Sequence, residues 1–348
     1  MKLSIGVLAY NERNTIGATV ASLLSQSVIV DPAIEMEIII VANGCSDDTA
    51  DVARKALGAA PRSAHLAVAV RDVPAAGKAN AWNIFIHEAS ASDAEFLVLM
   101  DADIEFGAPD AIARLVEHLK ENPDVLVAPD QPVKKFGDGE GFLRPFIRAL
   151  QKSGSDDDTA LSGQLYAARA STLRGVRMPI GIVVEDGFLR AMVLTANFTD
   201  PETRSRIRRA PGVRHFYRPY ETLSSIWRYE RRQAAGTAIN RFLYDEFRRW
   251  RAEGKNVTAE IDRRNAADPE WIEAVIAENV REGGRIVVPR NYWLRRLRRA
   301  PQNTFKALAK APLIAAAVMY DIAVAFAASR QLRGKVAGSG RWDSIRSG

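Results

Sequence analysis

Two carboxylates one residue apart follow a buried strand and are the residues best placed to do chemistry. Five consecutive apolar residues, 96–100, predict a strand covered on both faces, and Asp101 and Asp103 come directly after it. Side chains two apart in an extended chain point the same way, so both carboxylates should face one ligand. Oxygen ligands at this edge of a sheet suit Mg²⁺ or Mn²⁺ bridging nucleotide phosphates. The alternative is that the acids only cap a turn or the next helix.

The elements around this pair alternate between strand and helix over the first 130 residues. Each apolar run is followed by a helical segment that begins with a capping residue, a Gly-Lys pair or a proline. This order predicts an α/β fold with a doubly wound, mostly parallel sheet. The predicted strands are 3–9, 37–41, 65–70, 96–100 and 124–128.

The second half of the chain is predicted to be mainly helical. Residues 161–169 resemble a strand, 185–194 a helix, and 206–217 a basic hairpin around Pro211–Gly212. Helical spacing begins near Glu221, and amphipathic helices are expected over 241–284. We therefore predict an α/β domain at 1–235 and a helical C-terminal region at 236–348.

Composition restricts the class of protein. The chain has 348 residues, 47% of them hydrophobic and 26% charged, which is typical of a globular protein and excludes general disorder. Cys45 is the only cysteine, and no apolar run lies near Met1. Both features favour a reducing, cytoplasmic location over secretion.

Positive charge gathers in one segment, which we call the basic block (residues 281–310). Nine Lys and Arg residues there face a single acid, Glu282. A solvated surface, an anionic membrane surface and nucleic acid are the possible explanations. The apolar segment 312–328 follows and contains Asp321. It could span a membrane, lie in its interface or be buried, and the adjacent basic block favours contact with an anionic bilayer.

Three further motifs lie at strand ends. Ala9-Tyr10-Asn11-Glu12 follows the first strand, Asn43 lies in the turn after the second, and Gly77-Lys78 begins a helix after the third. Free backbone N–H groups and a lysine at a helix start favour an anion. Each motif alone is compatible with an ordinary strand-to-helix turn or a solvated lysine.

Together with Asp101, Asp103 and the pair Glu185-Asp186, these motifs resemble a family 2 glycosyltransferase with the GT-A fold, over residues 1–235. The resemblance implies the role of each matching residue. A nucleotide-sugar donor would contact Ala9, Tyr10, Glu12, Asn43, Lys78, Asp101 and Asp103. Of these, Asp101 and Asp103 would also hold Mn²⁺ or Mg²⁺.

The same resemblance assigns the catalytic and acceptor residues. In inverting members the second acid of the Glu-Asp pair is the base, so Asp186, next to Glu185, would take the proton of the acceptor hydroxyl. Gly163 and Gln164 would floor the acceptor pocket. Arg231 or Arg232 would hold the diphosphate. The Gln-x-x-Arg-Trp element of polymerising members is missing, which favours transfer of a single sugar.

The partners follow from the same motifs. We expect a UDP-sugar, with a GDP-sugar as the alternative because Ala42 stands where many members place an acid that reads uracil. The basic block and the apolar segment predict a lipid or lipid-linked acceptor and a peripheral position on the inner face of the membrane. A soluble acceptor is the alternative. A nucleic-acid-binding protein is the competing class; it rests on the basic block alone, and we expect no nucleic-acid partner.

Overall fold

The computed structural model describes residues 1–136, 157–298 and 311–336. In this part of the chain six strands form the main sheet, in the order β3-β2-β1-β4-β8-β6. All pairs among the first four strands are parallel, and β8 is antiparallel to both of its neighbours. The bounds are β1 Lys2–Ala9, β2 Glu35–Asn43, β3 Leu66–Val73, β4 Phe96–Asp101, β6 Val127–Pro129 and β8 Leu165–Arg169. The predicted mostly parallel α/β sheet is confirmed.

The strand order creates a switch point between β1 and β4. The chain builds β2 and β3 outward on one side of β1, then returns so that β4 pairs with the other side, with Leu8 opposite Asp101. Helices that leave two adjacent parallel strands in opposite directions open a crevice at their carboxyl ends, which is where doubly wound sheets bind ligands. Ala9 and Asp101 end these two strands.

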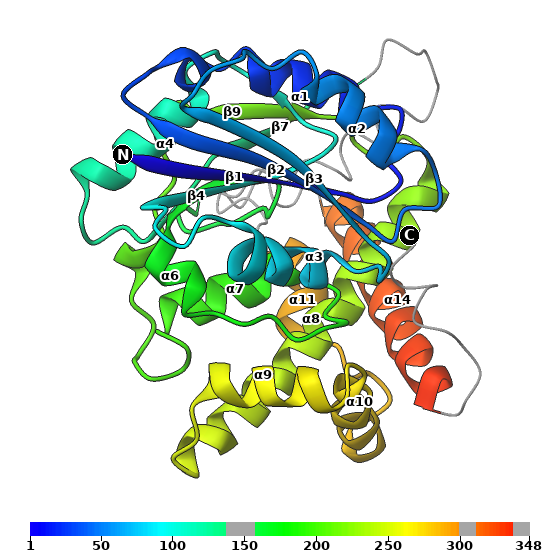
Figure 1. Ribbon diagram of the computed structural model, residues 1–348. Coiled ribbons are helices and arrows are strands. Elements are labelled where there is room, and N and C mark those ends of the chain that lie inside the picture. Colours follow the sequence, from blue (N-terminus) through cyan, green and yellow to red (C-terminus); the bar gives the residue numbers. More distant parts are fainter. Residues whose placement is uncertain (137–156, 299–310, 337–348) are drawn as a thin grey trace.

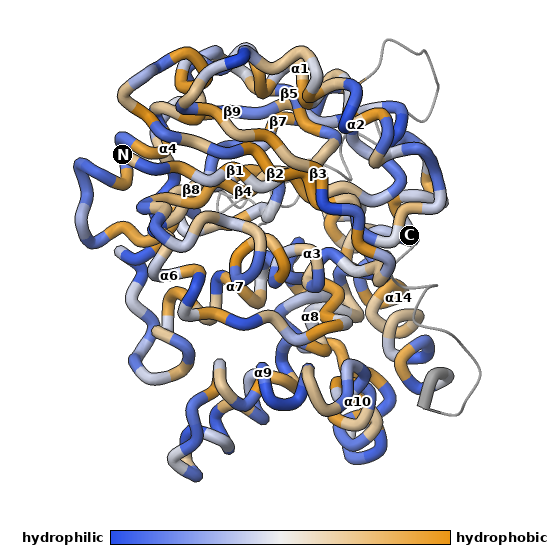
Figure 2. Tube along the Cα trace, in the orientation of Figure 1, coloured by the Kyte–Doolittle hydropathy of each residue, from blue (hydrophilic) through white to orange (hydrophobic). Residues whose placement is uncertain are grey.

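Helices cover both faces of the sheet (Figure 1). One core contains side chains of α1, α2 and α4, and the other contains side chains of α3, α6, α7 and α8 (Leu223–Ala252). Alternation along β4 sends Val98 and Met100 into the first core and Leu97 and Leu99 into the second. Figure 2 shows hydrophobic residues gathered along these central strands. The helices are α1 Ile16–Leu24, α2 Thr49–Leu57, α3 Lys78–Ile84, α4 Ala111–Glu121, α6 Ala170–Arg174 and α7 Glu185–Leu194.

A small second sheet lies beside the end of β4. It contains β5 Glu105–Phe106, β9 Arg214–Tyr217 and β7 Gln131–Lys134, in that order. The predicted hairpin over 206–217 is wrong. The turn at Pro211–Gly212 exists, but Ile207 bridges to Val127 whereas β9 pairs with β5 and β7. The two arms of the turn therefore join different sheets, a choice that local turn chemistry does not determine. Short helical segments are η1 Ser27–Val30, η2 Phe85–Ala89 and η3 Arg204–Arg206.

The C-terminal region is helical, as expected. Its described helices are α8 Leu223–Ala252, α9 Val257–Ala267, α10 Trp271–Glu282, α11 Arg290–Trp293, α12 Arg295–Arg298 and α14 Ala311–Val336. The predicted domain boundary at 235/236 falls inside α8, and one core cluster contains both Ala235 and Ala238. Residues 299–310 of the basic block lie outside the described residues.

Helix α14 contains the whole apolar segment and has two different faces. Asp321, Val324, Ala325 and Ala328 are buried against the protein, and the Asp321 carboxylate lies 3.2 Å from Arg295 Nη2 and 3.1 Å from Arg296 Nη1. The basic block thus supplies the partners of the acid in the apolar segment. No helix in the described ranges is long and apolar enough to cross a membrane.

Candidate active site

Lys78 joins two acids that come from different layers of the fold. Its Nζ lies 2.7 Å from Asp101 Oδ1, at the end of β4, and 2.8 Å from Glu185 Oε1, at the start of α7. The same Nζ lies 3.4 Å from the carbonyl oxygen of Gly163. Asp101 follows Leu97 and Leu99 on the β4 face that meets α3 and α7, which is why it reaches both residues. The structure therefore brings together four segments that are distant in the sequence.

Gly163 allows the close approach of Glu185 and Asp186. Its φ of +69° lies in the left-handed region, and a Cβ atom there would be 3.1 Å from the Asp186 Cβ and 3.4 Å from Glu185 Oε1. Its neighbour Gln164 accepts the backbone N–H of Asp101 through its carbonyl oxygen, at 2.9 Å. The two residues expected at the acceptor floor thus lie against Asp101 and Asp186.

The adjacent acids Glu185 and Asp186 have different pKa values because their surroundings differ. Burial raises the pKa of Asp186 to about 7, and the negative charge of Glu185 adds to the shift. Burial opposes ionisation of Glu185 as well, but the Lys78 charge outweighs it and lowers the pKa of Glu185 below its usual value. Paired acids with separated pKa values are typical of acid–base sites. Asp186 is therefore the member that can exchange a proton near neutral pH.

Strand β4 ends at Asp101, and Asp103 follows in a turn. Both acids lie within electrostatic reach of Lys78. Asp101 pairs with Lys78, and burial together with the Asp103 charge raises the pKa of Asp101 to about 6. Asp103 remains exposed at the crevice, and desolvation with the Glu12 charge raises the pKa of Asp103. The crevice contains more negative than positive charge.

The turns after β1 and β2 build the adjoining wall. Asn43 is buried, donates from Nδ2 to the Ala9 carbonyl oxygen at 3.2 Å and accepts the Gly77 N–H at 2.6 Å. It therefore fixes the start of α3, and with it Lys78, relative to the end of β1. Tyr10 is 45% exposed at this edge, where its ring can contact a ligand. Glu12 is held by Thr15 and by Thr49, whose Oγ1 accepts the Glu12 N–H at 2.7 Å.

Comparisons with known proteins agree with this fold. The model of the family described as Glycosyl transferase family 2 matches residues 4–178. The chain belongs to glycosyltransferase family 2. A mannosyltransferase from Pyrobaculum calidifontis, solved with GDP-Man and Mn²⁺, superposes with a TM-score of 0.50 at 18% identity, over 97% of this chain and 88% of that one. This similarity shows that the chain and the Pyrobaculum enzyme have the same fold.

A second solved structure is similar to this chain, with a lower TM-score. Glucosyl-3-phosphoglycerate synthase from Mycobacterium tuberculosis, solved with Mg²⁺ and UDP, has a TM-score of 0.45 at 22% identity, over 68% of this chain and 77% of that one. No curated protein sequence matches the glycosyltransferase.

One of the two candidate diphosphate-binding arginines lies near the acids. The positive charge of Arg232, on α8, lowers the pKa of both Glu185 and Asp186, so this residue lies close to them. Its Nε is buried and has no hydrogen-bond partner in the described ranges. The structure thus brings Arg232 to the cluster.

Sequence reasoning missed a buried Asp–His pair beside Asp103. His215 Nδ1 lies 2.6 Å from Asp130 Oδ2, and both side chains are fully buried. The other ring nitrogen, Nε2, has no hydrogen-bond partner within the described part of the chain, and an electrostatic interaction with Asp103 places the ring near that acid. A carboxylate on Nδ1 orients the ring and leaves Nε2 free for a ligand. The lone histidine in an otherwise basic segment was the only signal in the sequence.

Asp103 and His215 fit a divalent metal ion whose other ligands would come from a bound molecule and water. No group of three or more His, Cys, Asp or Glu side chains is arranged around a metal position in the described residues. Asp103 and the free His215 Nε2 nevertheless provide one hard oxygen and one imidazole nitrogen, next to uncompensated acids. Ions such as Mg²⁺ commonly take one or two protein ligands and fill the remaining positions with phosphate oxygens and water.

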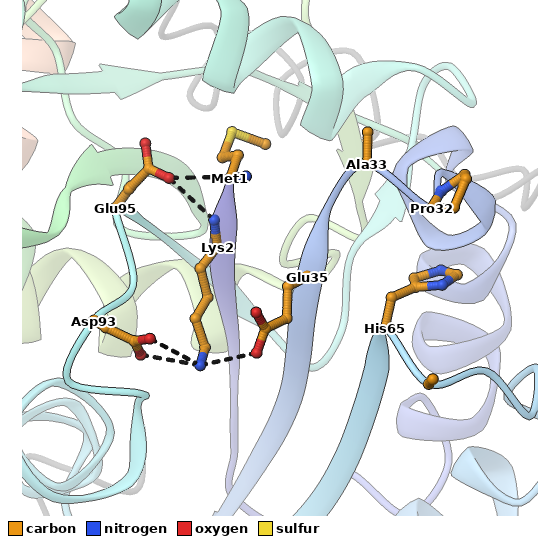
Figure 3. A pocket seen from close by; sticks show the side chains of 9 residues that line it. Met1, Lys2, Pro32, Ala33, Glu35, His65, Asp93 and Glu95 are labelled. Carbon is orange, nitrogen blue, oxygen red and sulfur yellow. Dashed lines mark hydrogen bonds and ion pairs between the residues drawn. The ribbon is translucent and has the colours of Figure 1, made fainter.

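A separate pocket of about 620 Å³ lies at the opposite, amino end of the strands (Figure 3). Lys2 is the cation here, and its Nζ lies 3.0 Å from both Glu35 Oε1 and Asp93 Oδ1. The two acids are 65% and 68% exposed. This cluster is therefore a solvated ion pair network, and ligand binding in such sheets occurs at the other edge.

Proposed function

We propose that the protein transfers one sugar from a nucleotide-sugar donor to an acceptor hydroxyl, with inversion, and that Asp186 is the base. The cluster of Lys78, Asp101 and Glu185 beside Asp186 carries this proposal. The acceptor oxygen attacks the anomeric carbon while the bond to the donor's diphosphate breaks, and the acceptor proton goes to Asp186 Oδ. A hydroxyl is a weak nucleophile at neutral pH, so a base with a pKa of about 7 is suited to the task.

The remaining residues bind and orient. Lys78 holds Glu185 ionised and fixes Asp101, while Arg232 faces the position where the diphosphate's charge accumulates. Asp103 and His215, with Asp101 nearby, would hold Mn²⁺ or Mg²⁺. When bound, that ion neutralises charge on the leaving diphosphate. Tyr10 and the backbone near Ala9, Glu12 and Asn43 would contact the nucleoside. The similar Pyrobaculum enzyme, solved with GDP-Man and Mn²⁺, supports this donor class.

A donor screen tests the proposal. Thermal unfolding is measured with UDP-, GDP- and dTDP-sugars, each with and without Mn²⁺. One donor should raise the melting temperature, and more strongly with the metal, because a ligand that binds only the folded state stabilises it. Analysis of the product should then show that the anomeric configuration of the transferred sugar is opposite to its configuration in the donor. If none of the donors shifts the melting temperature under either condition, the proposal is wrong.

We also propose that the enzyme sits peripherally on an anionic, cytoplasmic membrane face and acts on a lipid-linked acceptor. The outward face of α14 supports this: Met319 is 70% exposed and Phe326 is 51% exposed, while Asp321 faces inward. An apolar helix face beside a basic segment binds the surface of anionic bilayers without crossing them. A soluble acceptor remains the alternative.

Sedimentation with vesicles tests this position. Wild-type protein should bind phosphatidylglycerol vesicles more than phosphatidylcholine vesicles, and Met319→Ser/Phe326→Ser should reduce the binding. Val30→Ser is the matched control, because Val30 is 69% exposed on the distant segment η1. Equal vesicle binding by the double variant and wild type would show that α14 does not contribute to membrane binding.

A further inference from the structure

Three tyrosines lie between the residues that would hold the metal and the proposed base, and we call them the tyrosine cluster. Tyr217 ends β9, Tyr220 lies in the segment between β9 and α8, and Tyr229 lies near the start of α8. The ring centroids of Tyr220 and Tyr229 are 5.0 Å apart, and Tyr217 lies within electrostatic reach of both rings. The proposed mechanism assigns these side chains no role.

Tyr217 lies beside the residues that would hold the metal. Residues two apart in a strand share a face, so Tyr217 and His215 lie on the same side of β9. Their ring centroids are 5.8 Å apart. Burial, together with the negative charge of Asp103, raises the pKa of Tyr217 to about 12. Tyr217 is therefore a neighbour of both Asp103 and His215.

Tyr229 lies on the face of α8 that packs against the start of α7. Tyr229, Arg232 and Gly236 are three and four residues apart, so they share one side of the helix. A Cβ atom at Gly236 would lie only 2.2 Å from Val184 Cγ2, and Val184 comes directly before the Glu-Asp pair. Burial raises the pKa of Tyr229, and the negative charge of Asp186 adds to the shift. Tyr229 is therefore the member of the tyrosine cluster that lies beside the proposed base.

The hydroxyl groups of Tyr217 and Tyr229 are available to a ligand. Neither hydroxyl forms a hydrogen bond with any residue that the structure describes, and both side chains are partly exposed. In three other tyrosines the hydroxyl group is already bonded to the protein: Tyr166, Tyr244 and Tyr292. A phenol is protonated at neutral pH, so it can both donate to and accept from a sugar hydroxyl.

The positions of these two hydroxyl groups match the path of an inverting transfer. In such a reaction the acceptor oxygen and the leaving diphosphate lie on opposite sides of the anomeric carbon. The base lies on the acceptor side and the metal on the diphosphate side, so the transferred sugar lies between Asp186 and Asp103. Tyr229 is next to the first of these acids and Tyr217 is next to the second. Aromatic rings with a polar tip can pack against the apolar face of a sugar and bond to its hydroxyl groups.

We propose that the tyrosine cluster binds the transferred sugar, and that this sugar is a pyranose whose hydroxyl groups bond to Tyr217 and Tyr229. Tyr220, which is 37% exposed, packs against the Tyr229 ring and holds it in place. The inference rests on the proposed glycosyl transfer and names the residues that bind the donor's sugar. Tyr217 and Tyr229 contact the sugar and take no proton from the acceptor.

The affinities for a nucleotide sugar and for its nucleoside diphosphate test the inference. The ligand pairs are UDP-glucose with UDP, GDP-mannose with GDP, and dTDP-glucose with dTDP, each titrated by calorimetry with Mn²⁺ present. The pair that wild type binds most tightly is used. Its two members differ only in the sugar, so a change in the ratio of their affinities reports contacts to the sugar.

The test variant is Tyr217→Phe/Tyr229→Phe, which keeps both rings and removes both hydroxyl oxygens. The matched control is Tyr320→Phe, on α14, because the Tyr320 hydroxyl is buried and has no hydrogen-bond partner among the described residues. The melting temperature of each variant without ligand shows that it is folded. If the double variant does not fold, the single variants Tyr217→Phe and Tyr229→Phe are titrated in its place.

The double variant should bind the nucleotide sugar about tenfold more weakly than wild type, because two hydrogen bonds are lost, and should bind the nucleoside diphosphate as wild type does. Tyr320→Phe should bind both ligands as wild type does. An unchanged affinity for the nucleotide sugar, an equal loss for both ligands, or the same loss in Tyr320→Phe overturns the inference and leaves glycosyl transfer standing. If wild type binds no member of any pair, the inference and the proposed transfer are both wrong.

Discussion

The two edges of the main sheet each hold a lysine between two acids, yet they differ in burial and charge balance. At the amino edge, Lys2 meets Glu35 and Asp93, both well exposed, and its hydrogen bond lowers the pKa of Asp93 (Figure 3). At the carboxyl edge, Lys78 meets Asp101 and Glu185, which are 21% and 17% exposed. There the pKa of Asp101 is raised to about 6.

The difference lies in what surrounds each lysine. Water solvates the acids at the amino edge, so pairing is enough to keep them ionised. At the carboxyl edge, burial and the charges of Asp103 and Glu185 outweigh Lys78 at Asp101, whose pKa is raised, whereas Lys78 outweighs burial at Glu185, whose pKa is lowered. Excess negative charge in a desolvated crevice attracts a cation and keeps a proton available. An ion pair alone therefore does not indicate a ligand-binding site, whereas a buried cluster with excess negative charge does.

Replacing the base should give the largest effect. Asp186→Asn keeps the shape of the side chain but cannot accept the proton, so turnover should fall about 10²- to 10⁴-fold. Stabilisation by the donor should remain. Asp93→Asn, at the other edge, is the control and should keep full turnover. If Asp186→Asn retains wild-type turnover in a steady-state assay, another group is the base.

Exchanging the two lysines for methionine compares the edges directly. Lys78→Met leaves Asp101 and Glu185 without their shared cation, so turnover should fall at least about tenfold and stability by about 1–2 kcal/mol, allowing for partial exposure. Lys2→Met should leave turnover unchanged and shift the melting temperature only slightly. Turnover and thermal unfolding are measured on both variants. Equal losses of turnover and stability in Lys78→Met and Lys2→Met would show that the two edges do not differ as described.

The pH profile sharpens the assignment of the base. Because the pKa of Asp186 is about 7, its carboxylate form decreases as pH falls through neutrality. The value of kcat/KM should drop about tenfold from pH 8 to pH 6, because this parameter reports the pKa values of the free enzyme. An acid such as Asp93, whose pKa is lowered by its hydrogen bond from Lys2, would give a flat profile over this interval. A rate that is constant down to pH 5 would argue against Asp186.

A smaller effect should be visible in stability. The pKa of Asp186 is raised in the folded state, so between about pH 4 and pH 7 the folded protein binds more protons than the unfolded chain, and its stability decreases as pH rises. Asp186→Asn removes this dependence. The variant should therefore melt a few degrees above wild type at pH 8 and no higher at pH 4. The same difference at both pH values would contradict the raised pKa.

Much of the fold was predictable because it depends on local patterns. Alternating apolar strands and capped helices indicated the parallel sheet, and the helix 185–194 was predicted with the bounds that α7 has. The small second sheet was not predictable. Strands β5, β7 and β9 have at most four residues each, and their pairing is set by contacts between distant segments. For the same reason the hairpin at Pro211–Gly212 was wrong.

Local sequence patterns were enough to predict which residues lie at strand and helix ends, including Asp101, Lys78 and Glu185, because strand period and helix starts are short-range properties. The folded chain was needed to show that Lys78 lies between the two acids, that Asp130 orients His215, and that Asp321 pairs inward with arginines of the basic block. These contacts join distant segments across layers of the fold. Their charges and burial, and therefore their pKa values, exist only after the chain has closed around them.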